Sequence, residues 1–262
     1  MTEEEAAERI SGKKILIATP MYGGMCSGVY VQGLIQTITF LGKLNVSVQW
    51  VQMSNESLIP RGRNELARQF METDADYMIF VDADIAFGAH AIGQLMAADK
   101  PVVGALYPKK EVNWAAVKKA ARAGDIDNLE MHAGAFVFNT DSKADPTTDE
   151  YGCVEVRHVG TGFMMIRRDV LELLSYKVPT YRRSTVKDEA GEYVDALTHE
   201  FFATRIDVSG AYLSEDYDFC ELCRDNDIKV WANPFIKLGH WGSYLFEGDI
   251  LKNGGRRLDE GV

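Results

Sequence analysis

The first 107 residues of this 262-residue chain alternate short apolar segments with segments of helical periodicity. Strands are predicted at 13–19, 46–53, 77–82 and 100–107, and helices at 28–43, 60–74 and 88–99. When a helix separates each strand from the next, the strands pair in parallel, so the sequence predicts an α/β fold with a doubly wound sheet. In such a sheet, ligands bind beyond the carboxyl ends of the strands.

The second half is less regular in its pattern. Residues 152–174 predict a hairpin-like pair of strands followed by a helix, and residues 214–227 predict a helix capped by Ser214. Residues 228–243 predict a strand, a turn and a second strand. The polar segments 139–150 and 182–193 predict loops.

Charge and composition exclude several classes of protein. A net charge of −11 disfavours broad contact with a nucleic-acid backbone or an anionic membrane. No apolar run approaches the roughly 18 residues that span a bilayer, and the acidic start MTEEEAAERISGKK does not resemble a signal peptide. We therefore expect a cytoplasmic protein with free cysteines, in which Cys220 and Cys223 of a C-x-x-C are buried thiols rather than a metal site.

The third predicted strand ends in two carboxylates. The segment YMIFVDADIAF (77–87) places Asp82 and Asp84 at its carboxyl end. Burying an unpaired carboxylate costs several kcal/mol or keeps it protonated, so a partner is expected. Either both side chains cap backbone N–H groups in a turn, or they bind Mg²⁺ or Mn²⁺, which prefer oxygen ligands and share them with substrate phosphates.

Six short segments occur in a suggestive order along residues 13–243. They are ILIATPMYGG, IPRGRNELA, FVDADI, VGTGFMMIRRDVL, LSEDYDFCELCRDNDIKVWA and KLGHWGS. In this order they resemble motifs of GT-A-fold glycosyltransferases, which use nucleotide sugars. The motifs are the first strand and loop that hold the base and ribose, an arginine-bearing segment, the D-x-D, the segment beside the acceptor, an acidic E-D pair heading a helix, and a C-terminal histidine that completes the metal site.

The resemblance implies a GT-A, Rossmann-like α/β fold with a mixed, mainly parallel sheet flanked by helices and an acceptor-side elaboration in the second half. It implies one domain over 1–262, with a nucleotide-binding half (13–107) and an acceptor-side half that includes the C-terminal metal-site segment (108–262). The implied activity is a metal-dependent hexosyl or pentosyl transfer from a UDP- or GDP-sugar, with Mn(II) or Mg(II), to a hydroxyl acceptor. The acceptor is a glycan, a protein, a small molecule or a modified nucleic-acid base, and the acidic charge of the chain disfavours the last.

The resemblance also assigns roles to individual residues. Asp84 is the direct metal ligand, Asp82 reaches the ribose or a metal-bound water, and His240 is a further metal ligand unless a backbone carbonyl holds it in a packed strand. The residues expected to line the nucleotide are Thr19, Pro20 and Met21. Arg61, Arg63 and Asn64 lie at a predicted helix start, which favours phosphate but is equally compatible with a solvated helix end.

Glu215 and Asp216 have two interpretations. As acids at a helix start they interact favourably with the helix dipole and need no further function. As a catalytic pair, one of them accepts the proton of the acceptor hydroxyl. Asp216 is the base if the enzyme inverts the anomeric centre; in a retaining enzyme the pair positions the acceptor or stabilises the oxocarbenium-like centre.

Three other functional classes share part of this pattern. Phosphatases and phosphotransferases with an aspartate nucleophile continue D-x-D-x-Thr/Val, whereas Ala86 occupies that position here and two predicted strands precede the motif. Sugar-nucleotide pyrophosphorylases need a basic G-x-G-T-R loop, and ATPMYGGMCSG has no arginine. A non-catalytic sugar- or nucleotide-binding module would not need Glu215 and Asp216.

Overall fold

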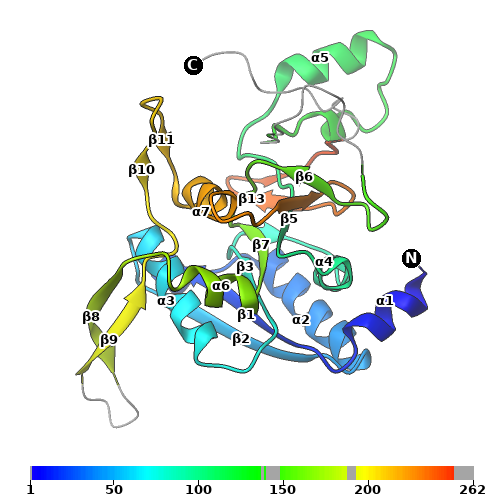
Figure 1. Ribbon diagram of the computed structural model, residues 1–262. Helices are drawn as coiled ribbons and strands as arrows, with labels where there is room; N and C mark the ends of the chain where they lie inside the picture. The colour runs from blue at the N-terminus through cyan, green and yellow to red at the C-terminus, as the bar shows by residue number, and fades with distance from the viewer. Residues whose placement is uncertain (1, 137–138, 140–147, 188–192, 251–262) are drawn as a thin grey trace.

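A seven-stranded mixed sheet forms the centre of the computed structural model, which describes residues 2–136, 139, 148–187 and 193–250 (Figure 1). Its strand order is β2-β1-β3-β7-β5-β12-β6. The strands are β1 (Lys14–Met21), β2 (Ser47–Ser54), β3 (Tyr77–Val81), β5 (Val102–Ala105), β6 (Val154–Val156), β7 (Phe163–Arg167) and β12 (Val230–Asn233). Strands β2, β1, β3, β5 and β12 share one direction, and β7 and β6 run opposite to their neighbours. This confirms the predicted α/β class with a mixed, mainly parallel sheet.

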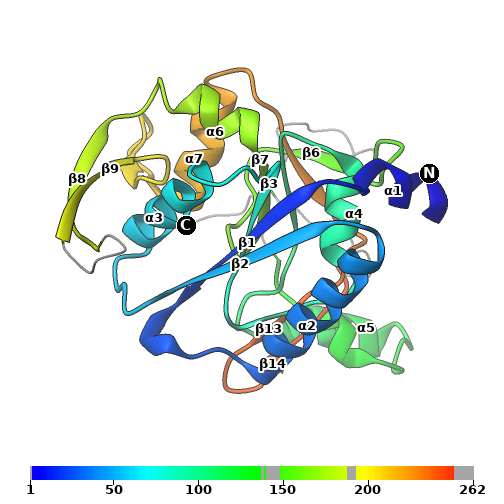
Figure 2. The ribbon, with the colours of Figure 1, turned by 90° about the horizontal axis from the view of Figure 1, so that it is seen from below.

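Helices cover both faces of the sheet (Figures 1 and 2). One layer contains α1 (Glu3–Ile10), α2 (Gly28–Lys43) and α4 (Ala91–Ala98), and the other contains α3 (Ile59–Met71), α6 (Arg168–Leu174) and α7 (Glu215–Arg224). Successive strand side chains point to opposite faces. In β1, Ile15 and Ile17 therefore enter the first core while Leu16 and Ala18 enter the second. Burial on both faces explains why the inner strands β1, β3, β5 and β7 are largely continuous apolar runs.

Every element predicted in the first half is present, with shifts at the ends. Helix α2 matches its predicted range, and α3 begins one residue earlier and ends three residues earlier than predicted. Ser27 precedes α2 and its Oγ accepts a hydrogen bond from the N–H of Tyr30 (3.2 Å), which satisfies one free donor of the first turn. Pro60 lies in the first turn of α3, where a missing N–H costs nothing.

The predicted hairpin in 152–174 is wrong. Strands β6 and β7 form but are not neighbours, because β7 inserts between β3 and β5 whereas β6 pairs with β12 at the edge of the sheet. The two strands run in the same direction, which a tight hairpin forbids. The helix that follows, α6, is confirmed.

The predicted loop 182–193 is also wrong for the residues that the structure describes. Residues 182–187 belong to β8 (Thr180–Lys187), which pairs antiparallel with β9 (Tyr193–His199). A second hairpin joins β10 (Arg205–Ile206) and β11 (Tyr212–Leu213), and both hairpins extend away from the sheet on the left of Figure 1. Of the other predicted loop, residues 140–147 lie outside the described residues.

The C-terminal part of the chain returns to the strand-end carboxylates. A three-stranded sheet, β14-β13-β4, is formed by β4 (Ile85–Ala86), β13 (Gly239–Trp241) and β14 (Leu245–Phe246). The strands predicted in 228–243 are thus confirmed as β12 and β13, in two different sheets. Helix α5 (Trp114–Arg122) and the 3₁₀ turns η1 (Tyr22–Gly24) and η2 (Leu129–His132) were not predicted. Among the described residues, no helix combines the length and apolar character needed to cross a membrane.

Candidate functional site

A cavity of about 680 Å³ lies beyond the carboxyl ends of β1, β2 and β3. Its wall combines the loop around η1, the start of α3, the end of β3 and the end of β13. Four of the residues predicted from the sequence line it: Pro20, Arg63, Asp82 and Asp84. The exposed aromatic side chains of Tyr22 and Trp241 lie at the same wall. The cavity is therefore at the sheet edge where ligands are expected in this fold class.

The partner of Asp82 is Arg63. The Arg63 side chain is buried, and its Nη2 lies 2.7 Å from Asp82 Oδ1. Its guanidinium also packs over the Phe80 ring, 4.9 Å from the centroid, and its Nε lies 3.9 Å from Glu215 Oε1. Arg63 thus connects the carboxylates after β3 with the acids at the start of α7. Its predicted place at a helix start is confirmed, but its charge faces two carboxylates of the protein.

Asp84 has two basic neighbours. Its Oδ2 lies 2.5 Å from Lys110 Nζ, and its Oδ1 lies 3.4 Å from His240 Nε2. Burial would raise the pKa of the Asp84 carboxyl, but its interactions with His240 and Lys110 outweigh burial, and the pKa lies below its ordinary value. Asp84 is therefore held as a carboxylate at the cavity wall. Nothing in the sequence pattern singled out Lys110.

The His240 ring is oriented by the backbone. Its Nδ1 lies 2.9 Å from the carbonyl oxygen of Pro108. A carbonyl only accepts hydrogen bonds, so Nδ1 carries the proton and, in a neutral ring, Nε2 presents a lone pair to Asp84. The alternative in which a backbone carbonyl holds His240 in a strand is therefore confirmed. The metal-ligand role stays a prediction for Nε2, which faces the strand-end carboxylate. Two acceptors at this distance need a proton or a cation between them.

Asp84 and His240 fit part of a divalent metal site. Adjacent ligands of an octahedral Mg²⁺ at ~2.1 Å lie about 3 Å apart, close to the separation of these two atoms. A carbonyl that holds the second imidazole nitrogen is the usual support of a metal-bound histidine. Within the described part of the chain, no group of three or more His, Cys, Asp and Glu side chains is placed to hold a metal ion. The residues therefore suit a cation that takes two protein ligands and completes its coordination with phosphate and water.

A second cavity, of about 220 Å³, lies at the start of α7. Asp216 lines this cavity, and its Oδ1 accepts hydrogen bonds from the Ser214 hydroxyl and from the N–H of Tyr217 (2.9 Å). Ser214 is the N-cap residue, as predicted, but its hydroxyl donates to Asp216 and caps no backbone N–H. Burial raises the pKa of Glu215, and the nearby Asp216 adds to the rise, whereas Arg63 opposes it.

Tyr107 is a site residue that sequence reasoning missed. It follows β5, lines the smaller cavity, and its ring lies edge-on to the His240 ring with centroids 5.4 Å apart. Burial raises the pKa of Tyr107, and the charges of Asp82 and Asp216 raise it further. A Cβ on Gly160 or Gly162 would lie 2.3 or 2.7 Å from the Tyr107 hydroxyl oxygen. The glycines of VGTGF were the available signal for this close approach.

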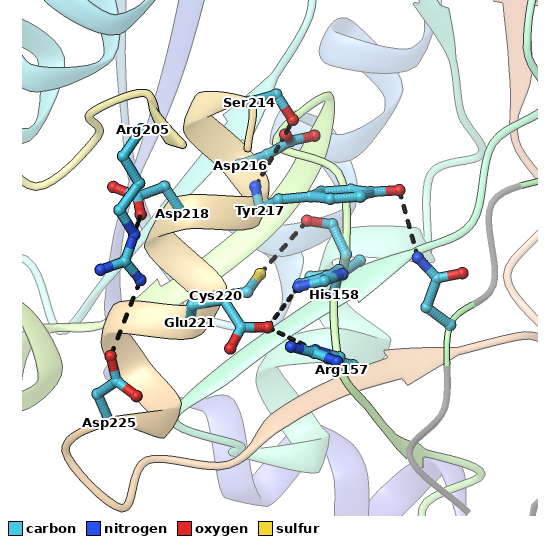
Figure 3. A network of polar contacts seen from close by, with 12 residues as sticks. Arg157, His158, Arg205, Ser214, Asp216, Tyr217, Asp218, Cys220, Glu221 and Asp225 are labelled. Carbon is cyan, nitrogen blue, oxygen red and sulfur yellow. Dashed lines mark hydrogen bonds and ion pairs between the residues drawn. The ribbon is translucent and has the colours of Figure 1, made fainter. Parts of the chain in front are cut away.

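A network of side chains fixes the position of α7 (Figure 3). The Glu221 carboxylate accepts hydrogen bonds from Arg157 Nε and His158 Nε2, both at 2.6 Å. The His158 ring stacks on Tyr217 with centroids 4.2 Å apart, next in sequence to Asp216. Cys220 and Cys223 are buried on the same helix, as expected for structural thiols. The helix start that carries the acids is thereby held against the segment after β6.

Four residues predicted to contact the nucleotide lie outside the set of described residues that line the larger cavity. The Thr19 hydroxyl is buried, 2.5 Å from the Tyr30 hydroxyl, and Met21 is buried in the first core. Asn64 is buried and exchanges two hydrogen bonds with the backbone of Phe202 (3.0 and 2.8 Å). Arg61 forms a bidentate ion pair with Glu56 (2.7 Å for both contacts). Their side chains have structural partners, and a role toward a nucleotide remains a prediction.

No protein-family model matches the chain, and no curated protein matches it. Among solved structures, it is similar to GalNAc-T7 with UDP, GalNAc and Mn2+, with a TM-score of 0.42 and 9% identity over 87% of this chain and 43% of that chain. It is also similar to S. aureus TarS, with a TM-score of 0.33 and 14% identity over 63% of this chain and 30% of that chain. A further similar structure is S. aureus TarS 1-349 in complex with UDP-GlcNAc, with a TM-score of 0.33 and 16% identity over 80% of this chain and 64% of that chain.

The chain thus spans less than two thirds of the length of each of these three chains. All three TM-scores lie below 0.5.

Proposed function

We propose that this chain is a metal-assisted glycosyltransferase that moves a hexosyl or pentosyl group from a UDP- or GDP-sugar to a hydroxyl acceptor. The observation that carries the proposal is the pair of Asp84 Oδ1 and His240 Nε2, 3.4 Å apart beside a cavity of about 680 Å³. A cavity of this size suits a nucleotide-sized ligand. It lies at the strand ends where an α/β fold binds such ligands.

Each part of the larger cavity has a role in this proposal. Pro20 and Tyr22 form the wall against the nucleoside, and Asp82, held by Arg63, faces the ribose. Asp84 and His240 hold Mn(II) or Mg(II), which, when bound, neutralises the diphosphate leaving group. Residues 13–107 thus bind the donor, and residues 108–262 supply His240 and the acceptor side.

Asp216 is the residue that we propose as general base, provided that the reaction inverts the anomeric centre. It lines the smaller cavity, whereas Glu215 is turned toward Thr161 (3.3 Å) and Arg63 (3.9 Å). A hydroxyl acceptor in that cavity would lie within reach of the Asp216 carboxylate. In this proposal Glu215 is not the base but an ion-pair partner of the buried Arg63. A glycan, a protein or a small molecule provides the hydroxyl in this proposal, and a modified nucleic-acid base is the less favoured acceptor.

The test is calorimetric binding of UDP and GDP with and without Mn²⁺. We expect metal-dependent binding of at least one nucleotide, weakened at least tenfold by Asp84→Asn, which keeps the shape of the side chain and removes its charge. Asp74→Asn is the matched control, because Asp74 also pairs with a lysine, Lys14, but precedes β3 at the opposite end of the sheet. Metal-dependent affinity that Asp84→Asn leaves unchanged would contradict the proposal.

A second measurement separates the remaining functional classes. A thermal-shift panel with Mn²⁺ tests nucleotides, nucleotide sugars and phosphate analogues, and release of the sugar from each bound nucleotide sugar tests for turnover. A response to phosphate analogues alone indicates a phosphatase, and binding without any turnover indicates a non-catalytic module. Metal-linked nucleotide binding together with sugar release supports the transferase.

A further inference from the structure

Lys110 pairs with the Asp84 carboxylate, which is itself one of the two candidate metal ligands. Its Nζ lies 2.5 Å from Asp84 Oδ2, while His240 Nε2 faces Oδ1. Both oxygens of Asp84 therefore have a basic partner from the protein. One of these partners is an ammonium group, which is a cation but cannot coordinate a metal ion.

The Lys110 contact is supported by packing along the stem of the side chain. A Cβ on Gly242 would lie 3.2 Å from Lys110 Cδ and 3.5 Å from Cγ, so the stem lies directly against the backbone after β13. The N–H of Trp241 donates to the Asp84 carbonyl oxygen (2.7 Å), which holds that backbone beside Asp84. A side chain at position 242 would therefore press on the stem of Lys110.

The two carboxylates after β3 differ in how firmly their basic partners are held. The Arg63 side chain is 4% exposed, so a metal ion that displaced it from Asp82 would leave a buried guanidinium with only Glu215, at 3.9 Å, as its ion-pair partner. The Lys110 side chain is 41% exposed and sits on a flexible stem, so water can replace Asp84 as its partner. Only the Asp84 carboxylate can therefore exchange its cation at low cost.

We propose that Lys110 and a divalent cation occupy Asp84 alternately, so that Lys110 is a built-in competitor that leaves the carboxylate when a metal binds. The inference rests on the proposed function only in taking Asp84 as a metal ligand. Two cations at one carboxylate repel each other strongly, and the doubly charged ion displaces the singly charged one. Lys110 then keeps the carboxylate neutralised in the metal-free protein and sets the metal concentration at which the site fills.

The test is Mn²⁺ affinity without nucleotide, measured by electron paramagnetic resonance of free Mn²⁺. Lys110→Met keeps a long stem and removes the charge, and we expect Mn²⁺ to bind about fivefold more tightly, the ratio expected for a half-exposed ion pair of about 1 kcal/mol. Lys109→Met is the matched control, because the adjacent Lys109 pairs with Glu111 (3.8 Å) and makes the same change in net charge. The control should leave the affinity unchanged.

The double variant with Asp84→Asn gives the decisive comparison. If competition at Asp84 causes the tightening, Lys110→Met has no effect on Mn²⁺ binding once Asp84→Asn is present. Unchanged or weaker binding in Lys110→Met, or equal tightening in both backgrounds, overturns the inference. Because no nucleotide is used in this titration, the two proposals can fail separately. Tighter Mn²⁺ binding by Lys110→Met in a protein that binds no nucleotide supports the competition and contradicts the transferase. Metal-dependent nucleotide binding without tighter Mn²⁺ binding by Lys110→Met supports the transferase and contradicts the competition.

Discussion

Arg63 offers the sharpest test of how the site is held together. Arg63→Met removes the charge but keeps an apolar stem of similar length against Phe80. Asp82 and Glu215 then lose their cation while their side chains remain 32% and 16% exposed. Removing one partner of a buried ion pair costs about 3–5 kcal/mol. Because Asp82 is partly exposed, we expect about 3 kcal/mol of lost unfolding free energy at pH 7.5.

The loss should depend on pH in a direction that the structure defines. The pKa of Glu215 is already raised in the folded protein, with Arg63 opposing the rise, so the variant raises it further. A carboxyl whose folded pKa is raised binds more protons in the folded state, so its unfavourable contribution grows as pH rises from the unfolded pKa, about 4.3, through the folded pKa. The deficit of Arg63→Met should therefore shrink when the pH is lowered from 7.5 to 5.

Urea unfolding of both proteins at the two pH values measures this difference, and Arg167→Met is the control. Arg167 also pairs with a carboxylate, that of Asp169, but its side chain is 33% exposed and that of Asp169 is 59% exposed. We expect the control to cost about 1 kcal/mol or less. A deficit for Arg63→Met no larger than that of the control, or one that grows toward pH 5, would refute the reasoning.

Two further predictions concern the smaller cavity. Gly160→Ala should cost about 1–3 kcal/mol of unfolding free energy, because its Cβ would meet the Tyr107 hydroxyl oxygen at 2.3 Å. The cost should fall in a Tyr107→Phe background, with Gly88→Ala as a control that meets nothing within 4 Å; equal costs in both backgrounds would place the strain elsewhere. Asp216→Asn should lower turnover about 10²–10⁴-fold with little change in donor affinity. Steady-state kinetics and calorimetry together test this, and equal losses would make Asp216 a binding or folding residue.

The first half of the fold was predictable because its signals are local. A strand buried on both faces must be a continuous apolar run, and a helix between two such runs must return the chain for parallel pairing. The second half failed where partners lie far apart in the sequence. Strand β7 looked like half of a hairpin with β6, but its partners are β3 and β5. Residues 182–187 resemble part of a loop in sequence, but they belong to β8, and their strand partners lie in β9, further along the chain.

The sequence by itself determined the class of sheet, the place of Asp82 and Asp84 at a strand end, and the acids at the start of α7. It did so because apolar periodicity and helix-start chemistry are properties of neighbouring residues. Only the tertiary structure decided the partners: Arg63 for Asp82, with Lys110 and His240 for Asp84. Each pair joins separate elements across a few ångströms, and charge pairing depends on that distance, which no spacing along the chain encodes.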